Sequence, residues 1–252
     1  EKEFGKLFNI KSYNSSLLFI PNEVLNNSGS FFKVYTPFWK NALNKLNLRD
    51  PLPIPKIKSI YEKKILSIKQ SVIDKESKIW EKKILSHFKP GEVNAREMLE
   101  QIAIKLNGYS QNRDFPIQNN TSLLSPYLAR GELSVNEIFF SVKRNKKKFN
   151  NDDYIKFTSQ LGWREFSYNI LYNFPKLPNK NFVSKFDNFP WLKNSKYLSS
   201  WKKGSTGYPI VDAGMRELRA TGYMHNRLRM IVASFLIKNL NISWVDGAKW
   251  FW

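Results

Sequence analysis

The run Thr121-Ser122-Leu123-Leu124-Ser125, followed by Pro126, has the residue types needed to bind a phosphate. Ser125 and Pro126 predict the cap and first turn of a helix, where free backbone N–H groups and the positive end of the helix dipole attract an anion. The hydroxyls of the run would surround that anion. A plain helix cap explains the same residues, so both interpretations stay open.

A second group places an amide, an indole, a guanidinium and a hydroxyl on one face of a helix predicted over residues 154–172. Spacings of three and four residues bring these side chains together, and they are Gln160, Trp163, Arg164 and Ser167. A glutamine amide can donate and accept hydrogen bonds, but it cannot supply a proton. Another face of the helix carries Tyr154, Phe157, Leu161, Tyr168 and Tyr172.

A pair of helices further along the chain carries polar residues on uncharged faces. Pro209 suits a first helical turn and Gly222 the position after the helix end, and the second helix is expected over about 224–240. This second helix has two uncharged faces, which predicts burial on two sides. One face holds Leu228, Ile231, Val232, Phe235 and Leu236, and the other holds Asn226, Met230, Ala233 and Ile237.

Such burial would leave two residues of this helix in need of partners. A buried Asn226 requires a hydrogen-bond partner in the protein or in a ligand, and Arg229 requires an anion or a carboxylate. Arg227, Ser234 and Lys238 form the ribbon that is expected to face water. On periodicity alone, a core helix pair with satisfied polar groups is favoured over a ligand site.

The overall composition favours a polyanionic partner. The 252 residues include 41 lysines and arginines against 21 acidic residues, a formal net charge of +20, and nucleic acid is the first candidate. An AT-biased genome would also enrich lysine, so both explanations stay open. The absence of cysteine excludes disulfides, thiolate catalysis and cysteine-bound metal, and the two histidines are too far apart to predict a metal site.

Nothing in the sequence predicts a membrane protein. No apolar run reaches the ~18 residues of a membrane span. No signal peptide is visible at the start of the sequence, so a cytoplasmic location is expected by default.

The elements that must position these residues are predicted to be helices from about residue 93 onward. Residues 1–40 mix apolar runs with turn residues and include a short strand at 17–20, and residues 41–92 form a proline-punctuated linker with a connecting helix. Residues 93–252 form an all-α domain. In this domain we expect one helix at 95–106, a second that begins with a capping box at 134–137, and a third that is capped by Asp152 or Asp153. A basic loop is expected at 143–148 and an irregular segment at 179–200.

Two runs in this domain resemble signatures of the photolyase and cryptochrome flavoprotein family. They are TGYPIVDAGMREL from Thr206 and NRLRMIVASFLIKNL from Asn226, and the similarity extends over about residues 31–252. The resemblance implies a mainly α fold, the all-helical FAD-binding domain of photolyase type, preceded by the tail of an α/β antenna domain. Because the chain begins at Glu1 and ends inside an aromatic run, we expect a piece truncated at both ends.

The resemblance implies FAD as the cofactor. The run from Thr121 to Ser125 matches the stretch that holds the FAD pyrophosphate, and Tyr109 matches a flavin-contacting tyrosine. The other implied FAD contacts are Trp163, Arg164 and Arg229. A second antenna chromophore, of folate or deazaflavin type, stays unidentified, and further flavin-contacting residues are expected beyond residue 252.

The resemblance also implies damaged DNA as the partner, bound by a monomer without regard to sequence. Trp163 would pack against a flipped-out pyrimidine dimer, and Arg164 would lie near the flavin phosphates or the damaged strand. Asn226 and Met230 stand where enzymes for the six-four photoproduct place histidines, so they match the cyclobutane-dimer branch. The implied DNA contacts are Arg113, Gln160, Trp163, Arg164, Ser167, Asn226, Arg227 and Met230.

The implied activity is light-driven DNA repair, in which excited reduced FAD donates an electron that splits the cyclobutane ring. Gln160 and Asn226 are the catalytic candidates at the lesion, and Gln160 departs from the glutamate usual in this branch. Trp191 and Trp244 match two members of the family's electron-transferring tryptophan triad, although tryptophans in a helical core ordinarily serve packing. The open alternatives are a cryptochrome photoreceptor, a cofactor-free basic nucleic-acid-binding module and an inactive fragment.

Overall fold

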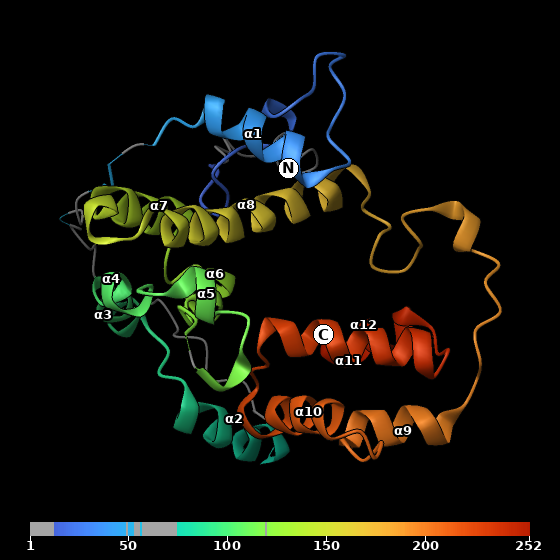
Figure 1. Cartoon of the computed structure of the whole chain (residues 1–252). Helices are drawn as coiled ribbons and strands as arrows, with labels where there is room; N and C mark the ends of the chain where they lie inside the picture. The colour runs from blue at the N-terminus through green and yellow to red at the C-terminus, as the bar shows by residue number, and fades with distance from the viewer. Residues whose placement is uncertain (1–12, 49, 53–55, 57–74, 119) are drawn as a thin grey trace, which may run out of the picture. The chain divides into compact units, whose positions relative to one another are not determined.

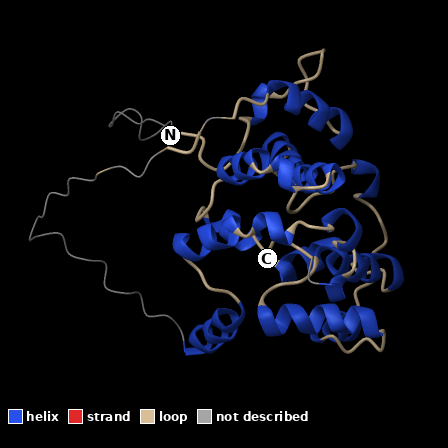
Figure 2. Cartoon of the chain, turned by 60° about the vertical axis from the view of Figure 1, so that its left-hand side comes forward, coloured by secondary structure: helices blue, strands red, loops and turns tan. Residues whose placement is uncertain are grey.

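The computed structural model describes residues 13–48, 50–52, 56, 75–118 and 120–252, and this part of the chain consists of helices joined by loops (Figure 2). Within it, extended pairing is limited to one bridge between Leu25 and Phe31. The predicted mainly α fold is confirmed. The strand predicted at 17–20 is wrong, because the backbone N–H groups of Leu18 and Phe19 donate to the Glu165 carboxylate and not to a neighbouring strand.

The chain divides into two compact units that interleave along the sequence. The first unit takes its described residues from 1–51, 91–111 and 120–175, and the second from 52–90, 112–119 and 176–252. The domain bounds at residues 40 and 92 stay a prediction. Residues 49, 53–55 and 57–74 of the expected linker lie outside the described residues, and its first residues are helical, because they belong to α1 (Tyr35–Lys45).

The longest helix of the first unit is α8 (Asn151–Asn173), with α1 and α7 (Val135–Arg144) packed against it (Figure 1). Its predicted position is confirmed, but its predicted cap is wrong. The side chain of Asn150 caps α8 by accepting from the N–H of Asp152. Asp153 is buried and accepts instead from the N–H groups of Gly108 and Ser110, at the start of α5 (Tyr109–Asn112).

Helix α1 approaches α8 closely at Gly162. A Cβ atom at this position would lie 2.5 Å from the ring of Trp39, so only a glycine lets the indole reach the α8 backbone. Phe38, Trp39 and Ala42 of α1 are buried. This contact fixes the part of α8 that carries the predicted site residues.

The other helix predictions for the first unit agree with the structure only in part. The helix expected at 95–106 is two helices, α3 (Glu92–Glu100) and α4 (Ile102–Lys105), because Gln101 leaves the helical conformation. Ser134 caps α7 as predicted, accepting from the N–H of Glu137 at 3.1 Å. The basic run is not a loop, because its first residues close α7 and the rest form a 3-10 turn, Lys146–Lys148.

Helix α10 (Pro209–Thr221) packs against the other long helices of the second unit. These are α2 (Lys75–His87), α9 (Ser195–Lys203) and α11 (Asn226–Ser234). The predicted helix start at Pro209 and end before Gly222, whose φ is 73°, are confirmed. The segment predicted to be irregular ends earlier than expected, because the side chain of Asn194 caps α9.

The core of the second unit surrounds Trp201, whose indole N–H donates to the carbonyl of Val232 at 2.9 Å. Leu228, Phe235 and Leu236 pack in the same cluster, so the predicted apolar stripe is confirmed. The helix that carries it begins at Asn226 and not at 224, because His225 caps it. It continues as a π-helix over Phe235–Asn239, before α12 (Trp244–Phe251).

Candidate functional site

The predicted site face of α8 is partly open to solvent. The side chain of Trp163 is 46% exposed, Ser167 is exposed, and Gln160 and Arg164 are half-buried. The Nε2 of Gln160 donates to the Lys156 carbonyl at 3.2 Å and to the Ser159 hydroxyl at 3.1 Å. The exposed part of the Trp163 indole is therefore accessible to a ligand.

Trp163 has a partner that the sequence did not suggest. The ring of Tyr35, the first residue of α1, stacks on its indole with centroids 3.7 Å apart and planes inclined by 8°. The Tyr35 hydroxyl donates to the carbonyl of Ser159 at 2.8 Å. Burial raises the pKa of Tyr35 to about 12, although the hydrogen bond with Ser159 opposes that shift, so the phenol is neutral at physiological pH.

The guanidinium of Arg164 contacts groups of its own unit. Its Nη1 donates to the Ser16 carbonyl at 2.7 Å and to Glu165 Oε1 at 3.1 Å, and its guanidinium lies over the ring of Tyr168. Burial raises the pKa of Glu165 to about 7, against the lowering effect of the Leu18 N–H and of Arg164. Sequence reasoning missed Glu165, since one acidic residue on a helix carries no signal for a distant loop.

The hydroxyl run of the first unit precedes α6 (Ser125–Arg130). Leu124 takes the cap position and Ser125 begins the helix, so the prediction that Ser125 is the cap is wrong by one residue. Leu123 adopts a φ of 54°, a left-handed conformation uncommon for a residue with a side chain. Tyr109 is buried, and its ring makes an edge contact with Phe157.

The uncharged second face of α11 is not buried, which corrects the prediction of a helix buried on two sides. Asn226 is exposed, and the side chain of Met230 is 55% exposed. Periodicity identifies a face without charge, but it does not determine whether another element packs there. The need of Asn226 for a buried partner therefore falls away, and the face is open to a ligand.

The arginines at the start of α11 bind neighbouring groups. Arg227 donates from Nε and Nη2 to the two carboxylate oxygens of Asp114. Its guanidinium is therefore paired with a carboxylate, whereas the sequence predicted that it faces water. This ion pair raises the pKa of Arg227. Arg229 donates to the carbonyl of Met224 at 2.9 Å and lies over the ring of Tyr223. Arg113 is buried.

His225 links the start of α11 to these residues. Its Nδ1 accepts from the N–H of Arg227 at 3.2 Å, which caps the helix. Burial lowers the pKa of His225, against the raising effect of the backbone of Arg113. A neutral imidazole at physiological pH keeps the Nδ1 lone pair that the cap requires. The sequence offered no signal for a histidine cap.

The segments that carry Trp191 and Trp244 are hydrogen-bonded to each other. The N–H of Leu192 donates to the carbonyl of Asn241 at 2.8 Å, and the Asn241 side chain donates to the Pro190 carbonyl. The indole N–H of Trp244 donates to the side-chain oxygen of Asn181 at 2.7 Å. Both tryptophans are half-buried, as electron-relaying or packing residues would be.

The predicted residues fall into two sets, each with its own unit. The first unit holds Tyr109, Thr121, Ser122, Leu123, Leu124, Ser125, Gln160, Trp163, Arg164 and Ser167, and the second holds Arg113, Trp191, Asn226, Arg227, Arg229, Met230 and Trp244. That the two sets form one site stays a prediction. No group of three or more acidic or histidine side chains in the described residues could hold a metal ion.

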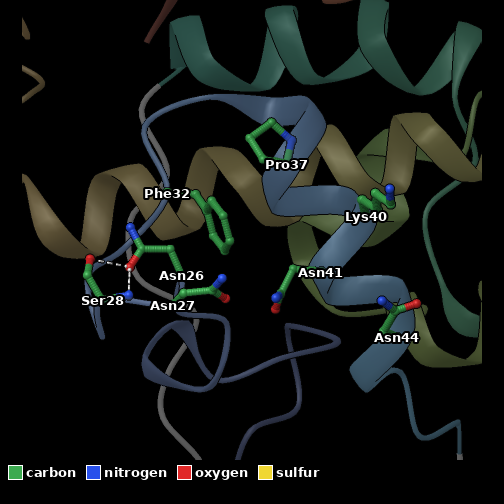
Figure 3. A pocket seen from close by; sticks show the side chains of 8 residues that line it. All are labelled: Asn26, Asn27, Ser28, Phe32, Pro37, Lys40, Asn41 and Asn44. Atoms are coloured by element: carbon green, nitrogen blue, oxygen red, sulfur yellow. Dashed lines mark hydrogen bonds between the residues drawn. The ribbon is translucent and has the colours of Figure 1, made fainter.

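Two surface depressions lie apart from these sets. One, of about 640 Å³, lies between the loop at 26–28 and α1 and is lined by asparagine side chains and Lys40 (Figure 3). The other, of about 700 Å³, lies beside α9, α10 and the aromatic run at 250–252. Neither contains a predicted site residue.

Comparison with known proteins decides the family. The family model described as the FAD binding domain of DNA photolyase matches residues 157–252. A deoxyribodipyrimidine photo-lyase from Agrobacterium fabrum is 40% identical to this chain in an alignment 253 residues long. The alignment covers 96% of this chain and 51% of the relative. The chain belongs to the photolyase and cryptochrome family. Its resemblance to that family's signatures is thereby confirmed.

Both branches of the photolyase and cryptochrome family are similar to this chain. Cryptochrome-2 from Arabidopsis thaliana is 35% identical over 266 residues, covering 100% of this chain and 44% of the relative. The solved structure of a bacterial class III photolyase from Agrobacterium tumefaciens matches with a TM-score of 0.79 and 41% identity, over 94% of this chain and 50% of the other. The chain thus spans about half the length of the curated relatives it matches.

Among the described residues of this photolyase-family chain, every helix is too short or too polar to span a bilayer. The cytoplasmic location and the monomeric state stay predictions.

Proposed function

We propose that the protein is a deoxyribodipyrimidine photo-lyase, a carbon–carbon lyase that uses blue light to repair cyclobutane pyrimidine dimers in DNA. The observation that carries the proposal is the exposed pair Asn226 and Met230 on α11, a helix whose other side is packed into the core. An amide and a flexible thioether suit contact with a pyrimidine, and neither exchanges a proton as histidine does. The pair therefore favours cyclobutane dimers over six-four photoproducts.

The residues before α6 fit the phosphates of FAD. Thr121 and Ser122 are half-buried, Ser125 is exposed, and Leu123 between them holds an unfavourable left-handed conformation. Backbone strain of this kind is more common at binding sites than in packing. The hydroxyls would donate to the pyrophosphate, and the other proposed FAD contacts are Tyr109, Leu124, Trp163, Arg164 and Arg229. When reduced and excited by light, FAD supplies the electron that splits the dimer.

Basic side chains of the protein would bind the DNA backbone without reading sequence. The net charge of +20 supports a strong electrostatic contribution, which falls as salt rises. A dimer leaves the duplex more easily than a normal base, because damage already weakens its pairing and stacking. Trp163 would then offer its exposed indole to the extruded pyrimidines, with Ser167 and Arg227 contacting the strand.

Gln160 would orient the dimer through hydrogen bonding alone. Its N–H donors are occupied by the Lys156 carbonyl and the Ser159 hydroxyl, so its carbonyl oxygen is the group left to accept an N–H of a pyrimidine. Asn226 can donate as well as accept. In this proposal neither residue transfers a proton to the lesion.

Trp244 and Trp191 would carry electrons toward the flavin from the surface. Tryptophan is the aromatic side chain that is oxidised most readily, and the hydrogen bond from Trp244 to Asn181 holds its indole in place. An amide oxygen accepts this bond without removing the proton, so the indole keeps its N–H.

A cryptochrome photoreceptor is the second candidate. Cryptochrome-2 is similar to the whole chain, and Gln160 cannot supply the proton that a glutamate could. A receptor would keep the FAD-binding residues and need no lesion-binding surface.

The test combines the purified protein, FAD, a reductant and an oligonucleotide with one thymine dimer under blue light. We expect the dimer to be split in the light and to persist in the dark. FAD binding without splitting would favour the cryptochrome. If FAD neither binds nor raises the melting temperature, this chain performs neither flavoprotein function, which leaves a basic nucleic-acid-binding module or an inactive fragment.

A further inference from the structure

The stacked pair of Tyr35 and Trp163 lies outside the buried centre of the contact between α1 and α8. Phe38 and Trp39 are buried in that interface, and Gly162 admits the Trp39 ring to the α8 backbone. Tyr35, by contrast, is the first residue of α1 and only half-buried, while Trp163 is 46% exposed. The stack therefore lies at the solvent edge of the interface, beside the predicted site residues of α8.

Two rings contact the Trp163 indole, and a hydrogen bond holds one of those rings in place. The Tyr35 ring covers one side of it at 3.7 Å and is almost parallel to it. Phe166 makes edge contacts with both rings, at 6.0 Å from Tyr35 and 5.9 Å from Trp163. The Tyr35 hydroxyl is held in turn by the Ser159 carbonyl at 2.8 Å. An exposed tryptophan without such contacts would occupy several rotamers.

We propose that Tyr35 is a positioning residue for DNA damage: its ring holds the Trp163 indole in one orientation, so that the uncovered part of the indole stacks an extruded pyrimidine dimer. The inference rests on the proposed function, and it adds a residue of α1 that none of the predicted sites includes. A side chain that is already ordered loses less entropy when a ligand binds, so the stack would strengthen recognition of the lesion. Stacking on an aromatic face does not depend on which base is presented, so it would add no sequence preference. The preference for damage would come from the easier extrusion of a dimer from the duplex.

The experiment compares the affinity of the purified protein, with FAD added, for a duplex carrying one thymine dimer and for the same duplex undamaged. We expect Tyr35→Phe to keep the wild-type preference for damage, because the ring is retained. Tyr35→Leu should lower that preference about 3- to 10-fold, the cost of ordering one freed side chain. Tyr172→Leu is the matched control, because Tyr172 is an exposed tyrosine ring of α8, the helix that carries Trp163.

Trp163→Ala sets the limit for complete loss of stacking. A Tyr35→Leu variant with the wild-type melting temperature and the wild-type preference would overturn the inference, and if this variant unfolds, Tyr35→Met takes its place. A preference unaffected by Trp163→Ala would also overturn it, while the proposed function would survive. No preference in the wild type, and no splitting of dimers, would contradict the proposed function itself.

Discussion

Glu165 on α8 accepts a hydrogen bond at 2.8 Å from the backbone N–H of Leu18, 147 residues earlier in the chain. It also lies beside Arg164, which in turn donates to the Ser16 carbonyl. A single buried carboxylate thus holds an N-terminal loop against the helix that carries Trp163. The stability of this unit should therefore depend on the protonation of Glu165.

Glu165→Gln should flatten the pH dependence of unfolding between about pH 4.5 and 7. The pKa of Glu165 is about 7 in the folded chain against 4.5 in a model peptide, so the folded state binds more protons in this window. Wild-type stability should then fall as pH rises through the window, by up to roughly 3 kcal/mol. Thermal melts at stepped pH measure it, with Glu100→Gln, an exposed position, as the control; equal pH profiles for wild type and variant would contradict the assignment.

Gly162→Ala should destabilise the first unit. In an exposed helix this substitution stabilises by about 0.5–1 kcal/mol, but here the new methyl would meet the Trp39 ring at 2.5 Å. Overpacking of this kind costs about 1–3 kcal/mol. Denaturant unfolding gives the difference, and the cost of Gly162→Ala should be smaller in a Trp39→Leu background, where the ring no longer meets the new methyl. A stabilising effect would show that α1 does not press on α8 at this point.

Asp212→Asn should weaken the start of α10. The carboxylate accepts from the N–H and hydroxyl of Thr206 and from the N–H of Gly207, at 2.6–3.0 Å. Burial acts to raise the pKa of Asp212, but these hydrogen bonds and Arg216 outweigh it and lower the pKa. The stabilisation is therefore present above the ordinary aspartate pKa of 3.8 and is lost as pH falls through the lower folded value.

The expected loss for Asp212→Asn is about 2 kcal/mol near neutral pH, since hydrogen bonds to a charged group are the strong ones. Chemical denaturation at pH 7 and pH 3 provides the measurement. Asp246→Asn, at an exposed position in the first turn of α12, is the control. Equal losses for the two variants would mean that the Asp212 hydrogen bonds do not stabilise the loop.

Trp244→Phe should strongly slow the light-driven reduction of bound FAD in the presence of an external reductant. The substitution keeps an aromatic ring but removes the easily oxidised indole and its hydrogen bond to Asn181. Absorbance of the flavin under blue light follows the reaction. Trp250→Phe, an exposed residue of the same helix, should leave the rate unchanged. Unaltered photoreduction in Trp244→Phe would exclude it from the electron path.

The sequence alone determined the elements whose signals are local. Pro209 and Gly222 bound α10 as predicted, since the fixed φ of proline and the left-handed tolerance of glycine act within a few residues. The apolar stripe of α11 was also read correctly, because helical period and hydrophobic burial are linked. The two family signatures lie in these same helices.

Only the tertiary structure decided which faces are covered and by what. The uncharged face with Asn226 and Met230 is open to solvent, although its composition resembles that of a buried face. Tyr35 reaches Trp163, and Glu165 reaches Leu18, across more than a hundred residues of chain. Periodicity describes one helix at a time, whereas these contacts arise from how helices and loops pack together, which no local pattern encodes.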